Sequence, residues 1–428
     1  MSVNTWLDYV EKSFQLPQSQ TASALANLFI LDLEQPIVSS LQNDIFDNGI
    51  DITTTVEAKN LHDGDWNTFV ELCITYLQFT RDVDPNNIDS YYIALIQFFT
   101  ALSPAFSNFR GSVLQTVLKN SASVVMDISK TLDKRDGSFT RTNYASTLLL
   151  KMFNSIRGEK MDPNNPSALS KKSIMLFIGN LLCRAYYILS SHASCANVFS
   201  NVDSSNIKFS RYPRSQLVEY RYFLGRFYLD RAQQVKAYNY LKWSFDNALS
   251  SSSNKRRILQ ILIPTSILLG RFPTLQLLQQ YNLAEIYWPL VRAMKSGNYG
   301  QYMQHLEGEY KPWFYKNRLL IFLKTRSQIV LFRQIFVKTW KALDHSDILP
   351  FKMIRRALEL STQADPEGFY KQVDDRDFLI TENIAISLIS QGFIKGNIFT
   401  RSELIKLKAS GAFPPLTEVH HTDKVTLI

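Results

Sequence analysis

The sequence predicts a mainly α-helical protein, in which a right-handed, tetratricopeptide-like helical-repeat solenoid is followed by a C-terminal winged helix. Three observations lead to this prediction. Apolar residues recur at helical spacing through the first two hundred residues. Small and aromatic residues between 224 and 244 have the spacing of a tetratricopeptide hairpin. Near the C-terminus the apolar period changes to two, which is typical of short strands.

The N-terminal part, residues 1–205, is predicted to consist of helical repeats joined by polar loops. The turn sequences Asp84-Pro85-Asn86-Asn87 and Asp162-Pro163-Asn164-Asn165 can each cap the helix that follows. Asp133–Gly137 is expected to be a charged loop, and the polar stretch from Ser200 to Ser210 ends this part. Helices are expected at 4–14, 21–31, 66–80, 89–103, 112–132, 143–156 and 171–190.

The central part, residues 206–345, contains the repeat signature. Leu224-Gly225 is followed by Tyr228 and then by Ala237, which is the tetratricopeptide order of residues. Gly225 and Ala237 are small, so the two helices of a hairpin can cross closely at these positions. A second Leu-Gly pair at 269–270 suggests that further hairpins stack as a solenoid.

Residues 346–416 are predicted to form a winged helix. Asp347 and Pro350 open a first helix, and a long acidic and polar loop follows at 361–378. Thr381 is expected to cap the second helix, 381–391, which Gly392 ends.

Two short strands complete this predicted winged helix. They are expected at Phe393–Phe399 and Leu404–Lys408, where apolar and polar residues alternate. In the second strand Ile405 and Leu407 should face one side, with Lys406 and Lys408 on the other. Residues 417–428 are predicted to be a tail.

Charge is distributed unevenly along the chain. Residues 1–100 carry 3 basic and 14 acidic residues, whereas residues 205–345 carry 22 basic and 7 acidic ones, a net charge of +15. Such a basic segment suggests an anionic partner. The alternative is that the cations only keep helical surfaces soluble.

Other classes of protein find little support in the sequence. No apolar stretch approaches the roughly 20 residues that a membrane span needs, and the N-terminus lacks the pattern of a secretory signal. The three cysteines are scattered, which fits a reducing compartment, the cytosol or the nucleus. No phosphate-binding loop, zinc-protease helix or nucleophile elbow occurs, so we expect neither an enzyme nor a cofactor.

Cations near the predicted winged helix are the candidate functional residues. The second helix carries Glu382 and no cation, so base-specific reading of the major groove by this helix is not expected. Contacts to phosphates, without sequence preference, fit better. The alternative is that these cations contact protein, because winged helices can pair with one another. The candidate residues are Lys352, Arg355, Arg356, Lys395, Arg401, Lys406, Lys408, Arg326 and Arg333.

Four segments resemble the PCI-domain family. They are RYPRSQLVEYRYFLGRFYLDR at 211–231, KRRILQILIPTSILLGRFPTLQLLQQY at 255–281, LVRAMKSGNYGQYMQHLE at 290–307 and LISQGFIKGNIFTRSELIKLKASGAFPPL at 388–416. Within that family they are similar to the subfamily of the TREX-type mRNA-export subunit and the signalosome-associated twelfth subunit. The segments span about half of the chain, from 211 to 416.

The resemblance implies a non-catalytic scaffold subunit of a complex in transcription, mRNA processing and mRNA export. It implies that the protein is nuclear and leaves an additional cytoplasmic location open. It implies three partners: a larger PCI-containing subunit of the export-factor type, a small acidic DSS/Sem-type protein, and RNA or DNA held through phosphates. It implies no association with a membrane. A purely architectural subunit, like those of the signalosome or proteasome lid, remains the alternative, and the sequence leaves the subgroup open.

Overall fold

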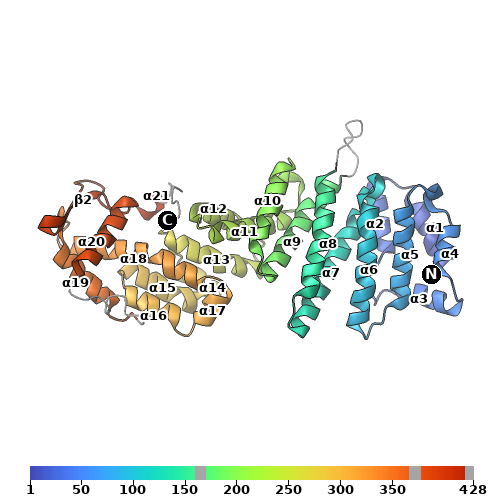
Figure 1. Ribbon diagram of the computed structural model, residues 1–428, viewed down its shortest axis with the longest axis horizontal. Coiled ribbons are helices and arrows are strands. Elements are labelled where there is room, and N and C mark those ends of the chain that lie inside the picture. Colours follow the sequence, from blue (N-terminus) through green and yellow to red (C-terminus); the bar gives the residue numbers. More distant parts are fainter. Residues whose placement is uncertain (160–169, 366–376, 420–428) are drawn as a thin grey trace. The chain divides into compact units, whose positions relative to one another are not determined.

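The computed structural model describes residues 1–159, 170–365 and 377–419, and these are mainly helical (Figure 1). The predicted fold class is confirmed, since helical hairpins are followed by a C-terminal winged helix. The chain divides into two compact units, Met1–Phe223 and Leu224–Ile428. The expected subdivisions at 205, 345 and 416 stay predictions.

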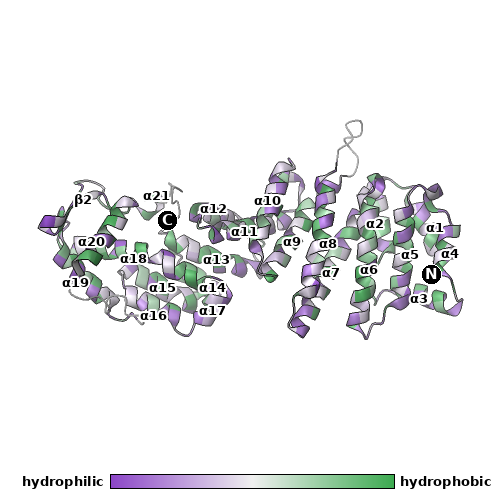
Figure 2. Cartoon of the chain, in the orientation of Figure 1, coloured by the Kyte–Doolittle hydropathy of each residue, from purple (hydrophilic) through white to green (hydrophobic). Residues whose placement is uncertain are grey.

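The first unit is built from helical hairpins whose apolar faces meet in a core. Its helices are α1 (Val3–Ser13), α2 (Gln18–Leu28), α3 (Pro36–Asp47), α4 (Ile52–Ala58), α5 (Asn67–Asp82), α6 (Ile88–Ser107), α7 (Gln115–Asp136), α8 (Thr140–Arg157), α9 (Met175–Ile188) and α10 (Cys195–Ser204). Apolar and polar residues alternate along single helices in Figure 2, as amphipathic packing requires. Trp6 stacks on Tyr76 with ring centroids 5.3 Å apart.

All seven helices that the sequence predicted in this unit are present. Asn87 caps α6 as expected, because its side chain accepts hydrogen bonds from the backbone N–H groups of Asp89 and Ser90. Three further helices, α3, α4 and α10, were not predicted. The turn predicted at Asp162-Pro163-Asn164-Asn165 lies outside the described residues.

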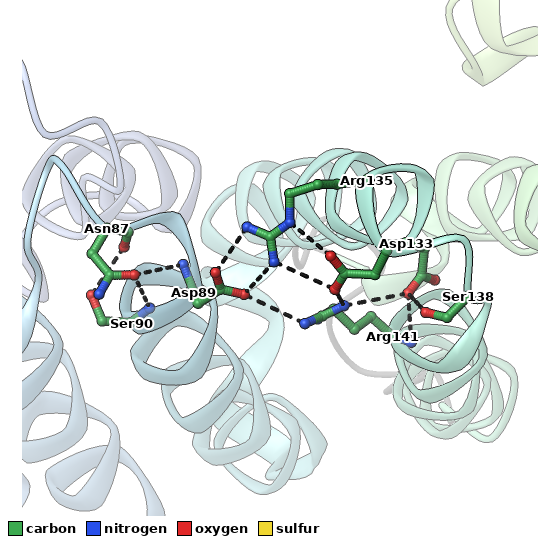
Figure 3. A network of polar contacts seen from close by, with 8 residues as sticks. Asn87, Asp89, Ser90, Asp133, Arg135, Ser138 and Arg141 are labelled. Carbon is green, nitrogen blue, oxygen red and sulfur yellow. Dashed lines mark hydrogen bonds and ion pairs between the residues drawn. The ribbon is translucent and has the colours of Figure 1, made fainter.

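The prediction of a charged loop at Asp133–Gly137 is wrong. Helix α7 continues through Asp136, and Gly137 ends it in the left-handed conformation with φ 65°. Asp133 is buried, and its carboxylate accepts hydrogen bonds from the backbone N–H groups of Arg141 and Thr142, so it caps α8. Figure 3 shows Asp133 beside Ser138 and Arg141. A charged residue is therefore held inside the hairpin by its hydrogen bonds.

An ion-pair network surrounds this cap (Figure 3). Arg135 binds Asp89 at 2.9 Å and Asp136 at 2.7 Å, while Arg141 binds Asp136 at 2.6 Å. Hydrogen bonds from Arg135 and Arg141 lower the pKa of Asp136 to about 2. Burial by itself raises the pKa of Asp133, but hydrogen bonds led by those of Thr142 outweigh it, so this pKa also lies below its usual value.

Helix α11 (Arg214–Asp230) begins in the first unit and ends in the second. The other helices before the winged helix are α12 (Gln234–Asn247), α13 (Asn254–Leu268), α14 (Leu275–Gln280), α15 (Ala284–Ser296), α16 (Tyr299–Glu307), α17 (Lys311–Lys316) and α18 (Leu320–Ala342). Gly225 lies where α11 touches α12, as predicted. A Cβ atom there would stand 2.7 Å from Leu241 Cγ and 3.3 Å from the Ala237 carbonyl oxygen.

The winged helix contains β1 (Ile348–Pro350), α19 (Phe351–Thr362), α20 (Asp377–Ser390), β2 (Gly396–Phe399), the 3₁₀ turn η6 (Thr400–Ser402) and β3 (Leu404–Leu407). The sheet is antiparallel with strand order β1-β3-β2. Strand β1 was not predicted. Thr381 lies inside α20 and is buried, so the prediction that it caps this helix is wrong. Residues 366–376 of the predicted loop lie outside the described residues.

The segment after the wing packs against α18 and the turn that follows α13. Phe413 lies 5.3 Å from the Trp340 ring, and Arg333 Nη2 donates a hydrogen bond to the Pro414 carbonyl at 2.7 Å. Leu416 begins α21 (Leu416–Val419) and fills the space beside Gly270, where a Cβ would meet its side chain at 2.6 Å. The segment thereby fastens the wing to the helical repeats of its own unit. Residues 420–428 of the predicted tail lie outside the described residues.

Candidate nucleic-acid interface

Three lysines, which we call the wing lysines, share the outer face of the small sheet: Lys395, Lys406 and Lys408. All three are exposed, while Ile405 and Leu407 between them are buried, so the predicted alternation is confirmed. The register pairs Gly396 with Leu407, and the Lys408 N–H donates to the Lys395 carbonyl at 2.9 Å. Lys395 and Lys408 therefore lie opposite one another, with Lys406 about 7 Å along the strand.

This arrangement concentrates positive charge. Like charges placed opposite one another across a sheet are destabilising. Within residues 1–159, 170–365 and 377–419, the wing lysines make no ion pair with a carboxylate. An anion bound on the outer face would relieve their mutual repulsion.

The tip of the wing carries a fourth cation, Arg401, which is exposed in the turn between the strands. The tip is fixed to α20, because Thr400 Oγ1 donates a hydrogen bond to Glu382 Oε1 at 2.8 Å. Glu382 is thus a structural contact of the wing. Glu403 next to the turn is also exposed, so the tip is less purely basic than the lysine face.

The cations of the first helix, which we call the α19 cations, are Lys352, Arg355 and Arg356. All are exposed and lie on the face away from the buried Ile354 and Leu358, which agrees with the helical spacing of these residues. However, Arg355 and Arg356 both bind Glu359, at 3.3 and 3.0 Å. Their charge is partly neutralised, which makes the α19 cations a weaker anion site than the wing lysines.

The two candidates on α18 differ from one another. Arg326 is half-buried, whereas Arg333 is only 8% exposed and binds the Pro414 carbonyl. Burial lowers the pKa of Arg333. A phosphate cannot reach a guanidinium held in this way, so the prediction that Arg333 contacts nucleic acid is corrected. Its role is to hold the segment after the wing.

The outer face of α20 exposes two large apolar side chains among polar ones and carries no cation. Leu379, Asn383, Ile386 and Ser390 follow one another at helical spacing and are exposed. Leu379 is 51% and Ile386 48% exposed. The lack of cations on this helix follows from the sequence, whereas the exposure of Leu379 and Ile386 is visible only in the structure.

Cations of the basic central part rest on aromatic rings. Arg231 lies over Phe227 at 4.3 Å, and Arg271 lies over Tyr238 at 4.7 Å. Lys255 and Phe245 make a similar contact at 4.9 Å. The ring covers one side of each cation, and Arg231 and Arg271 are exposed.

The part of the chain that the structure describes contains no group of three or more His, Cys, Asp or Glu side chains placed to hold a metal ion. His192 and Cys195, which are close in sequence, belong to no such group. No helix among the described residues is long and apolar enough to cross a membrane.

Comparison with known proteins gives the family. No family model matches the sequence. A PCI domain-containing protein of Schizosaccharomyces pombe is 29% identical over 436 residues, which cover 96% of this chain and 94% of the relative. The nuclear mRNA export protein THP1 of Saccharomyces cerevisiae is 25% identical over 450 residues, covering 92% and 96%. The chain is similar to these PCI-family proteins over nearly its whole length.

A third relative bears on the subfamily of this PCI protein. The protein CSN12 homolog of Schizosaccharomyces pombe is 28% identical over 253 residues, 58% of this chain and 57% of the relative. Together, the export protein and this homolog confirm the predicted subfamily. The PCI winged helix of this chain thus presents a basic sheet face, formed by the wing lysines, and an apolar helix face on α20.

Proposed function

We propose that this PCI protein is a non-catalytic scaffold subunit of a nuclear complex that couples transcription, mRNA processing and mRNA export, and that its wing binds RNA or DNA. Its full-length similarity to a protein named for nuclear mRNA export supports the nuclear setting. One structural observation carries the nucleic-acid part. The three wing lysines share one exposed face and have no carboxylate partner among the described residues.

The proposed mode of binding is contact with phosphates, without a sequence preference. Helix α20 offers no Lys or Arg side chain that could read base edges in the major groove. Lysines on a sheet face supply charge without fixed geometry, which suits the phosphate backbone of many sequences. The proposed surface also includes Arg401 at the tip and Lys352 on α19, which are exposed, and Arg326 on α18, which is half-buried.

The test is the salt dependence of RNA binding by the purified chain. Changing Lys406 and Lys408 to Ala should reduce the slope of log affinity against log salt by about 1.4, since each single-strand phosphate contact contributes about 0.7. The matched control changes Lys130 and Lys134, exposed on α7, to Ala and removes the same charge. Equal slopes for wild type, wing variant and control would refute phosphate binding by the wing.

The proposed larger PCI partner would dock on the outer face of α20. Leu379 and Ile386 are large apolar side chains exposed on a helix that is otherwise packed in the winged helix. Burying such residues is a favourable contribution to association. Changing both to Glu should release the partner in affinity purification. Changing Ile321, 71% exposed on α18, to Glu serves as the control and should leave the partner bound.

The proposed small acidic partner would bind the basic central part, residues 206–345. Exposed cations such as Arg231 and Arg271 are held on aromatic rings there, so charge and apolar surface alternate. Affinity for a disordered acidic chain should fall steeply with salt, because exposed charges are screened within about 10 Å at 0.1 M. An affinity unchanged between low and high salt would instead indicate an apolar interface.

The second candidate function is a purely architectural subunit without nucleic-acid contact. The apolar face of α20 favours it, because protein pairing alone would explain that face. The two candidates differ in the wing variant described above. If the chain is only architectural, loss of Lys406 and Lys408 leaves RNA affinity unchanged while the partner still co-purifies.

A further inference from the structure

A small cavity of about 220 Å³ opens beside the wing lysines, within the C-terminal unit. It lies between the end of α18 and the segment that follows β3. Three aromatic rings contribute to its wall, those of Trp340, His345 and Phe413, and Lys408 and Asp347 add charged groups. The remaining lining residues are Leu407, Ala409, Gly411 and Ala412.

The end of α18 shapes one side of this cavity. Beyond Ala342 the chain turns through Asp344 and His345, which both have positive φ, 49° and 62°. This left-handed conformation is strained for a residue that is not glycine. The His345 N–H donates to the Trp340 carbonyl at 3.0 Å, and the two rings meet edge to face at 4.3 Å. The helix end thus holds an exposed imidazole against a half-buried indole.

The segment after the wing forms the other side. Phe413 is held 5.3 Å from the Trp340 ring, while the carbonyl of the next residue, Pro414, is fixed by Arg333. Lys408 belongs both to the wall of the cavity and to the wing lysines. The cavity therefore borders the wing lysines, which are the surface proposed to hold phosphates.

We propose that this cavity receives one unpaired base of an RNA strand whose phosphates lie on the wing lysines. The inference rests on the proposed function and names the subsite within it. The volume is below the roughly 300–1,000 Å³ of sites that enclose whole small molecules, so a single ring system fits better than a nucleotide. Aromatic side chains beside a basic track are the means by which single strands are held, since every base has a face that stacks.

The charged groups of the cavity fit this occupant. Lys408 can contact the phosphate that precedes or follows the base. The Asp347 carboxylate can accept a hydrogen bond from an N–H group on the base edge. A duplex cannot supply such a base without unpairing it, so the site distinguishes single-stranded from double-stranded nucleic acid.

Two variants of the full chain test the inference. Ala409→Phe, at an exposed lining position, fills the cavity without changing charge, and His345→Ala removes part of its aromatic wall. Binding is measured, over several salt concentrations, to a labelled single-stranded RNA oligomer and to an oligomer of equal length with abasic ribose. Thermal unfolding of each variant checks that it is folded.

Wild-type chain should bind the RNA about tenfold more tightly than the abasic oligomer, a typical contribution of one stacked base. Both variants should lose this difference while keeping the salt slope of the wild type. Equal binding of the two oligomers by the wild type, with a steep salt slope, would overturn the base site and leave the phosphate contacts intact. Binding of neither oligomer would refute the proposed nucleic-acid function as well. If the variants instead release a co-purifying protein and bind RNA normally, the cavity takes a protein side chain and the inference is wrong.

Discussion

Replacing Gly225 with leucine is expected to lower the free energy of unfolding of the C-terminal unit by about 1–3 kcal/mol, the usual cost of overpacking. The reason is the close crossing of α11 and α12. A Cβ atom at this position would approach Leu241 Cγ to 2.7 Å and Leu241 Cδ2 to 3.1 Å. Leu241 is fully buried, and Cγ is the branch point of its side chain, so it has little freedom to move away.

Alanine at Gly225 separates the two contributions to this effect. Alanine favours a helix over glycine by roughly 0.5–1 kcal/mol, which opposes the clash. Gly225→Ala should therefore destabilise the unit by less than Gly225→Leu. Leu241→Ala alone should cost about 2–5 kcal/mol through the cavity it leaves. In that background Gly225→Ala should stabilise the protein by about 0.5–1 kcal/mol, because the clash is gone and the helix preference remains.

Denaturant unfolding of the wild type, Gly225→Ala, Leu241→Ala and the double variant, followed by circular dichroism, measures this double-mutant cycle, and Gly225→Leu is measured beside them. The informative result is the change of sign of Gly225→Ala between the two backgrounds. An unchanged unfolding midpoint for Gly225→Leu, or an equal effect of Gly225→Ala in both backgrounds, would refute the close packing of this hairpin. It would also remove the reason for the small residue in the repeat signature.

Three further predictions concern stability. Asp133→Asn should cost about 1–3 kcal/mol, because it weakens buried hydrogen bonds that cap α8; an unchanged urea midpoint would contradict this role. Asp136 has a pKa of about 2, below its ordinary 3.8, so its stabilising effect is full above about pH 5 and is lost as pH falls toward 2. Melting temperatures of wild type and Arg135→Gln between these pH values should converge at the acidic end, and parallel curves would count against the network. Arg333→Met should lose a hydrogen bond from a charged donor to Pro414, worth about 1.5–3 kcal/mol, and should speed proteolysis of the segment after the wing; equal cleavage rates would disprove its fastening role.

The spacing of apolar residues predicted most of the helices, because each helix contributes one apolar face to the core. Helix α5 is an example, since Phe69, Leu72, Tyr76 and Phe79 return every three or four residues and are buried together. The Gly225 hairpin was predicted for a related reason. Small residues at this spacing indicate that the two helices cross closely. The wing was predicted because Ile405 and Leu407 alternate with lysines over a full strand.

Features that depend on distant residues could not be predicted. Strand β1 has only three residues, and its pairing partner β3 lies more than fifty residues later in the sequence. Asp133 looks like a loop residue because its partners at the start of α8 are visible only in three dimensions. Arg333 looks like a surface cation until Pro414, far along the chain, covers it.

The candidate site was therefore predicted in part. The outward direction of Lys406 and Lys408 follows from strand periodicity, and that of Lys352 from helix periodicity. Their relation to Lys395 depends on register, which sequence does not specify here. The neutralising contact of Glu359 with Arg355 could have been found, since these residues are four apart on one helix face.

The most direct test of the proposed nucleic-acid function compares two triple variants in the assembled complex. One changes the wing lysines to Ala, and the other changes the α19 cations to Ala. RNA binding is measured at several salt concentrations for each and for the wild type. The wing variant should lose about 2 units of salt slope, from three contacts of about 0.7 each, and the α19 variant clearly less, because Glu359 already neutralises part of its charge. Slopes equal to the wild type in both variants would contradict the proposal and leave this winged helix as a module for pairing with protein.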